Sequence, residues 1–207
     1  MVGQGLSMGF MGSIVAAGSV VLQYGINNLG TLIIAGHTAA RKLFMFFNMP
    51  FSAMAMAIST FVSQNRGADQ RGRILKAMRC AVIYDFVMAA LVTVILGLFA
   101  KDLVQLISGS QEAVVLNNGA MYLQVVGPFY AVLGVLLETR FALQGLGAKM
   151  IPLVSSVIEL VGKVVFAFLF IPKFAYLVVI FCEPVIWCLM TAQLIYAFVT
   201  HPYIHWL

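Results

Sequence analysis

Charge is what this 207-residue sequence has least of. It contains only 12 Lys and Arg and 7 Asp and Glu, 9% of the chain, whereas a soluble domain usually carries about 25% charged residues. So few charges cannot cover the surface of a water-soluble globule, which excludes a soluble enzyme, a nucleic-acid-binding domain and a disordered chain. The net charge of +5 is therefore better explained by membrane topology than by a nucleic-acid partner.

Cysteine is also scarce, and the motifs of common catalytic chemistry are missing. The three cysteines form no Cys-x-x-Cys pair, and we expect them to act as small hydrophobic residues. Walker, Rossmann and His-Glu-x-x-His patterns are absent, so no cofactor, metal site or hydrolytic chemistry is predicted. Gly5, Ser7 and Gly9 match the spacing of a nucleophile elbow, but only four residues precede Gly5, too few for the required strand. A membrane-embedded protease is therefore a disfavoured hypothesis.

Long apolar runs with few charges make up most of the chain. A helix needs about 20 apolar residues to cross the hydrocarbon core, and spans in lipid must be helical here because their backbone groups find no water to bond. We therefore predict an all-α polytopic membrane protein with one transmembrane domain over residues 1–207. Its six spans are predicted at residues 8–34, 37–64, 76–99, 117–142, 151–171 and 176–199.

The charges between the spans predict the orientation of the chain. Segment 66–79 holds five cations and one anion, the pattern of a basic cytoplasmic loop. Counting spans in both directions places both termini in the cytoplasm. The loop between the third and fourth spans then lies outside, and its Lys101, Asp102 and Glu112 give it a net charge of −1. We expect a multi-pass protein of the cell membrane, surrounded by the lipid bilayer.

Ionisable side chains inside the spans are costly in hydrocarbon, so each is a candidate functional residue. Glu138 has no cation four residues away and is the favoured candidate for a carboxylate that exchanges a coupling cation. Glu183, which precedes a proline expected to break its helix, is a weaker candidate. Glu159 is also weaker, because it stands four residues before Lys163 and can pair with it. A self-neutralised structural pair explains Glu159 and Lys163 at least as well as a transport role.

Two other ionisable residues have simpler interpretations. Asp85 lies within two turns of Arg79, and the two are expected to pair. Arg140 stands five residues before Gly145 at the predicted cytoplasmic turn, and its long side chain is expected to extend to the membrane interface.

The first span carries polar side chains that a lipid-facing helix would not need. Gln23 and Asn27 stand four residues apart on one helix face, with Tyr24 beside them in the predicted outer half of the span. A wet substrate cavity and hydrogen bonds between helices explain them equally well.

The second span adds a cation pair and a surface rich in Met and Phe. Arg41 and Lys42 point about 100° apart on a helix, so one is expected to face a polar cavity and the other the headgroups. Met45 and Met49 belong to this Met- and Phe-rich surface. Flexible side chains of this type adapt to varied apolar ligands. On composition alone, ordinary packing is the favoured explanation for them. Pro50 predicts a kink in the middle of this span.

These features occur in the order found in a known family. Residues 20–31 (VVLQYGINNLGT) resemble the seventh helix of the multidrug and toxic compound extrusion (MATE) transporters. Residues 36–68 resemble the eighth, with a Thr-Ala-Ala start, a cation, a central proline and a Gln-Asn-x-Gly-Ala end. Residues 143–147 resemble the exit of the tenth helix. Glu159, and Glu183 with its following Pro-x-x-Trp, resemble positions in the last two helices.

The resemblance implies more than the residues show. MATE proteins have twelve spans in two six-helix lobes, and they export organic cations and other drugs in exchange for H⁺ or Na⁺ by alternating access. The chain is expected to be the C-terminal lobe of such an antiporter, with a cleft that holds the substrate against a missing N-terminal lobe. A second copy of the chain is the alternative partner. A lobe of a related lipid-linked sugar flippase is disfavoured, because such clefts tend to be strongly cationic.

Overall fold

A computed structural model describes the backbone of residues 2–205 and the side chains of residues 9–205, and it is helical throughout apart from short turns. Six of its helical segments are long and apolar enough to cross a membrane. The predicted all-α, six-span fold is thus confirmed. The elements, in chain order, are α1 (Val2–Asn27), α2 (Thr31–Gly67), α3 (Arg71–Ser108), α4 (Ala113–Val126), the 3-10 turn η1 (Gly127–Phe129), α5 (Tyr130–Gly145), α6 (Met150–Val165), the π-helical turn η2 (Phe166–Phe170), α7 (Ile171–Phe174), α8 (Tyr176–Val199) and α9 (Pro202–His205).

Several observed boundaries differ from the predicted ones, and α3 continues nine residues past the predicted end at 99, to Ser108. The first span was predicted to reach residue 34, but α1 ends at Asn27, because Gly30 adopts a φ of 102° and turns the chain into α2. Segment 66–79, predicted as a loop, is mostly helical, since α2 runs to Gly67 and α3 begins at Arg71. A charged segment can be helical in this way, because a helix can continue past the hydrocarbon into the headgroups. The sixth span, 176–199, coincides with α8.

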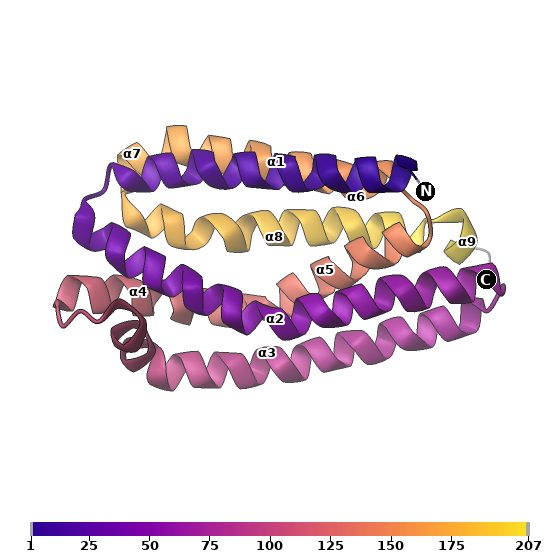
Figure 1. Ribbon diagram of the computed structural model, residues 1–207, viewed down its shortest axis with the longest axis horizontal. Helices are drawn as coiled ribbons and strands as arrows, with labels where there is room; N and C mark the ends of the chain where they lie inside the picture. The colour runs from indigo at the N-terminus through magenta and orange to yellow at the C-terminus, as the bar shows by residue number, and fades with distance from the viewer. Residues whose placement is uncertain (1, 206–207) are drawn as a thin grey trace.

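Proline affects three of the spans in different ways. Pro50 lies in the middle of α2, and Figure 1 shows α2 changing direction about halfway along, as predicted. The fourth span contains Pro128, which falls in the single 3-10 turn that separates α4 from α5. Pro184 does not break its helix, contrary to expectation, since α8 continues through it without interruption.

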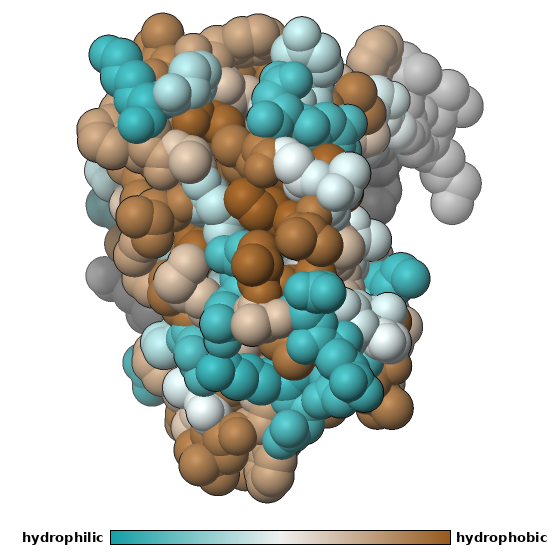
Figure 2. Space-filling view, turned by 90° about the vertical axis from the view of Figure 1, so that its left-hand side faces the viewer, coloured by the Kyte–Doolittle hydropathy of each residue, from teal (hydrophilic) through white to brown (hydrophobic). Residues whose placement is uncertain are grey.

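The connections gather at two ends of an elongated helical bundle. The first and last described residues lie at the same end as the α2–α3 turn and the α5–α6 connection (Figure 1). The α1–α2, α3–α4 and α7–α8 connections lie at the other end, which Figure 2 views end-on. Hydrophilic side chains gather there over the lower half, at the height of α3 and α4. The first and last described residues therefore lie at the same end of the bundle, as an even number of spans predicts.

The helices pack unevenly. α2 packs extensively against α5, α4 and α3, whereas α1 packs mainly on α6 and barely contacts α2. The centre of the lobe is an aromatic stack that joins α2, α5 and α8. Phe44 lies between Tyr130 and Trp187, with ring centroids 5.5 and 5.7 Å away, and Phe51 stacks on Tyr130 at 5.4 Å.

Gly36 allows α2 and α4 to approach closely, and this gives a first prediction. A Cβ at this position would lie 2.5 Å from the carbonyl oxygen of Val115. Gly36→Ala is therefore expected to lower the free energy of unfolding by about 1–3 kcal/mol, the usual cost of overpacking. The measurement is thermal unfolding of the protein in lipid nanodiscs. Gly97→Ala, where nothing lies within 4 Å of the added Cβ, is the matched control and should not lose stability. Equal melting temperatures for the two variants would contradict the close packing.

Candidate functional site

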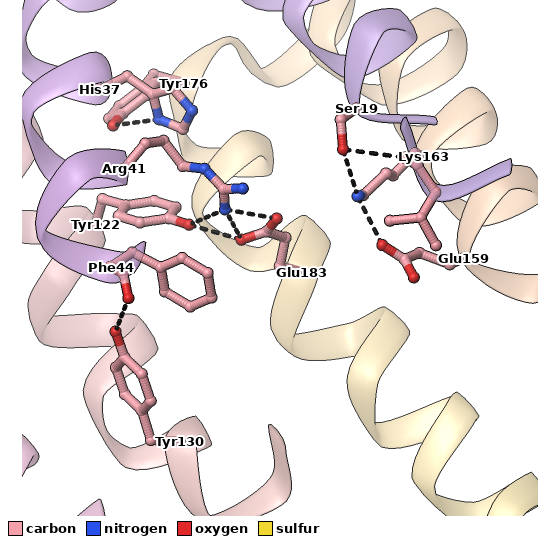
Figure 3. Close-up of polar contacts among 11 residues, drawn as sticks. Ser19, His37, Arg41, Phe44, Tyr122, Tyr130, Glu159, Lys163, Tyr176 and Glu183 are labelled. Carbon is pink, nitrogen blue, oxygen red and sulfur yellow. Dashed lines mark hydrogen bonds and ion pairs between the residues drawn. The ribbon is translucent and has the colours of Figure 1, made fainter. Parts of the chain in front are cut away.

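Arg41 lies at the centre of a polar network from three helices (Figure 3). Its Nη1 on α2 donates to both carboxylate oxygens of Glu183 on α8, each at 2.7 Å, and to Tyr122 Oη on α4 at 3.1 Å. Tyr122 Oη in turn donates to Glu183 Oε2 at 2.6 Å. One turn earlier on α2, His37 Nδ1 lies 3.2 Å from Tyr176 Oη. Glu183, a predicted coupling candidate, is therefore held in a charge-assisted network.

The aromatic stack lies against this network. The Arg41 guanidinium carbon lies 4.8 Å from the centroid of the Phe44 ring, a cation–π contact. Tyr130 Oη donates to the Phe44 carbonyl oxygen at 3.1 Å, which satisfies a hydroxyl that is buried in the core. Trp187 follows Glu183 by one turn of α8 and stacks on Phe44. The position of Arg41 is thus fixed by packing as well as by charge.

A second ion pair lies on α6. Lys163 Nζ lies 2.8 Å from Glu159 Oε1 and donates to Ser19 Oγ of α1 at 3.2 Å (Figure 3). The predicted pairing of Glu159 with Lys163 is thus confirmed. Arg140 lies 4.0 Å from Glu159 and donates to Ser155 Oγ, and its side chain is only 12% exposed. The expectation that Arg140 extends to the interface is wrong, because α6 offers it a hydroxyl and a carboxylate inside the lobe.

A polar cavity of about 100 Å³ lies between the two ion pairs. Gln23 and Arg41 both line it, and Lys163 and Glu183 lie on its wall. Gln23 is exposed, and its Nε2 donates to Asn27 Oδ1 along α1 at 2.8 Å. The structure therefore brings Gln23 and Arg41 together, although they are 18 positions apart in the sequence.

The remaining predicted cavity residues lie elsewhere. Tyr24 is 62% exposed and lines a separate cavity of about 460 Å³ against η2 and α7. Met45 and Met49 are 56% and 64% exposed, and neither lines the cavity at Arg41. They form an open apolar surface on α2 together with Phe46. Lys42 is exposed while Arg41 turns inward, the division expected for neighbours on a helix.

Glu138 has a partner that the sequence did not reveal. Asp85 on α3 and Glu138 on α5 are both fully buried. They lie near each other, because the carboxyl group of Asp85 lies against Gly134, one turn before Glu138 on α5. No N–H or O–H group of the described residues donates to any of their four oxygens. Two bare carboxylates in such a place would repel each other and lack solvation.

Gly134 makes room for this pair. A Cβ on Gly134 would lie 2.4 Å from Asp85 Cγ, so the carboxyl occupies the space that any other residue would fill. The expected pairing of Asp85 with Arg79 is wrong, since Arg79 is exposed and Asp85 points into the lobe. The one signal in the sequence was the glycine one turn before Glu138, but the sequence does not tell which helix faces it.

The chain resembles known proteins in one family model and in two solved structures. The MatE family model matches residues 8–169, and no curated protein matches the sequence. A crystal structure of a mutant MATE aligns with a TM-score of 0.83, and one of MATE in complex with MaD3S with 0.82. Both are 13% identical to the chain, and each alignment covers 96% of it and 45% of the solved protein. The chain thus spans less than half the length of these structures. At 13% identity, the structural similarity shows the fold alone.

Proposed function

Since the chain belongs to the MatE family of membrane transporters, we propose that it forms the C-terminal six-helix lobe of an antiporter that exports organic cations and other drugs in exchange for H⁺ or Na⁺. The observation that supports coupling to a cation is the buried pair of Asp85 and Glu138. The oxygens of this pair receive no hydrogen bond from the described residues. A bound cation is what such a pair requires. Binding or release of that cation biases the lobe between two arrangements.

The lobe works with a second six-helix unit in this proposal. The solved structures are more than twice as long as the region they share with this chain. The exposed apolar side chains of α2, Met45, Phe46 and Met49, suit contact with a soft substrate or with the other lobe. The second unit is an N-terminal lobe or a second copy of the chain. We further propose that the end carrying both termini and segment 66–79 faces the cytoplasm of the cell membrane.

A denaturing immunoblot of membranes, with a tag on the C-terminus at the native locus, distinguishes these partners. A band near 22.5 kDa means a separate half-transporter, whose partner is then sought by crosslinking. A band of roughly twice that mass, as two fused repeats would give, means that both lobes lie on one polypeptide.

Among the three coupling candidates, the contacts favour Glu138. Glu183 is neutralised by Arg41 and Glu159 by Lys163, whereas the charged group that the described residues place beside Glu138 is the carboxyl group of Asp85. Asp85 and Glu138 are fully buried, and one shared proton would remove the repulsion between their carboxyl groups. H⁺ is therefore the coupling ion that we propose.

The transport assay uses everted membrane vesicles from cells that produce the protein, with ethidium as the fluorescent organic cation. We expect ethidium accumulation driven by an imposed proton gradient, and Glu138→Gln should abolish the gradient-driven part because the neutral amide cannot exchange a proton. Glu112→Gln, at an exposed acidic residue before α4, is the matched control and should transport normally. Wild-type transport rates in Glu138→Gln would show that the pair is not the coupling site.

A further inference from the structure

The region around the polar cavity holds more positive than negative charge. Three cations, Arg41, Arg140 and Lys163, accompany two carboxylates, Glu159 and Glu183. Their side chains are at most 28% exposed. The cluster therefore carries a net charge of +1 with all five groups ionised, and an uncompensated charge inside a membrane is costly.

The two cations that line the cavity have hydrogen-bond donors to spare. A guanidinium has five N–H donors and an ammonium has three. The hydrogen bonds of Arg41 to Tyr122 and Glu183 all come from Nη1, which leaves its Nε and Nη2 without an acceptor among the described residues. Lys163 uses two donors, on Glu159 and Ser19. Figure 3 shows the Arg41 and Lys163 head groups directed into the space between the two ion pairs.

We propose that this cavity binds one small anionic group, a chloride ion or the carboxylate of a larger molecule, between Arg41 and Lys163. Its volume of about 100 Å³ corresponds to roughly three water molecules. A chloride ion or a carboxylate fits this space, and a whole drug-sized molecule does not. Gln23 is exposed at the cavity wall, so the group enters beside α1. This site is separate from the carboxyl pair and does not depend on the proposed antiport.

Trp187 provides a built-in reporter for binding. It stacks on Phe44, whose ring also contacts the Arg41 guanidinium. The sequence contains one other tryptophan, Trp206, which Trp206→Phe removes. The fluorescence of this single-tryptophan protein in nanodiscs is followed while chloride, or in a second arm acetate, replaces the bulky sulfonate MES at constant ionic strength.

We expect a saturable fluorescence change whose dissociation constant responds in opposite directions to two substitutions. Lys163→Gln removes a cation and should weaken binding about tenfold or more, the usual effect of losing a charge-assisted hydrogen bond. Glu159→Gln removes a carboxylate and should tighten binding, so misfolding cannot mimic both results. Lys173→Gln, at an exposed lysine of α7, is the matched control and should bind as the parent does.

The chloride and acetate titrations distinguish a halide from a carboxylate as the anionic group. Saturation by chloride alone supports a halide site, and saturation by acetate as well supports a site for a carboxylate group. A linear change that is the same in the parent and in Lys163→Gln, for both anions, would overturn the proposal and leave a cavity that holds water only.

Discussion

Gly134→Ala is expected to lower the free energy of unfolding by about 3 kcal/mol, at the upper end of the usual cost of overpacking. The added Cβ would lie 2.4 Å from Asp85 Cγ and 2.6 and 2.8 Å from the two carboxyl oxygens. The helices that carry Gly134 and Asp85, α5 and α3, are fixed by extensive packing, since α5 lies against α2, α3 and α8. The carboxyl group therefore has to leave its place beside Glu138. Thermal unfolding in nanodiscs measures the loss.

A compensating substitution tests whether that clash is the cause. Asp85→Ala removes the carboxyl group, so Gly134→Ala combined with Asp85→Ala should recover most of the lost stability. The double-mutant cycle then gives a large coupling between the two positions. Additive effects of the two substitutions would contradict the contact between Gly134 and Asp85.

Breaking the pair between Arg41 and Glu183 should have an equally large effect. Arg41→Met leaves Glu183, which is only 5% exposed, without its cation, and Glu183→Met leaves Arg41 without its carboxylate. Each single substitution is expected to cost about 3–5 kcal/mol, the usual result of leaving a buried charge unpaired. Chemical unfolding of the single and double variants provides the measurement.

The double variant is the informative one. Arg41→Met with Glu183→Met removes both charges, and it should be more stable than either single variant because no unpaired charge remains. Asp69→Asn, at the exposed hydrogen bond from Tyr203 Oη, is a control and should change stability by less than about 0.5 kcal/mol. A double variant whose loss equals the sum of the two single losses would show that the pair does not interact.

The membrane fold could be predicted from the sequence because its signals are local. Apolar runs of the necessary length indicate the six spans, and the family resemblance is confirmed by the MatE match over residues 8–169. The exact ends of the helices could not be predicted, since helices continue past the hydrocarbon where charge begins. The turn at Gly30 depends on a backbone conformation that composition does not reveal.

The candidate site was predictable only where its contacts lie on one helix. Glu159 and Lys163 pair across a single helical turn, and the spacing shows it. Arg41 and Glu183 are 142 positions apart, and their meeting depends on how α2 and α8 pack. For the same reason Asp85 was assigned to nearby Arg79 instead of to Glu138 on another helix.

The central claim is that Asp85 and Glu138 carry the coupling proton, and proton release on substrate binding tests it most directly. Ethidium is added to the purified protein in weakly buffered solution, and the released protons are counted with a pH indicator. The account predicts release of about one proton per ethidium bound, by linkage between the two equilibria, and none from Glu138→Gln. Ethidium binding with no proton release from the wild type, or with equal release from Glu138→Gln, would contradict it.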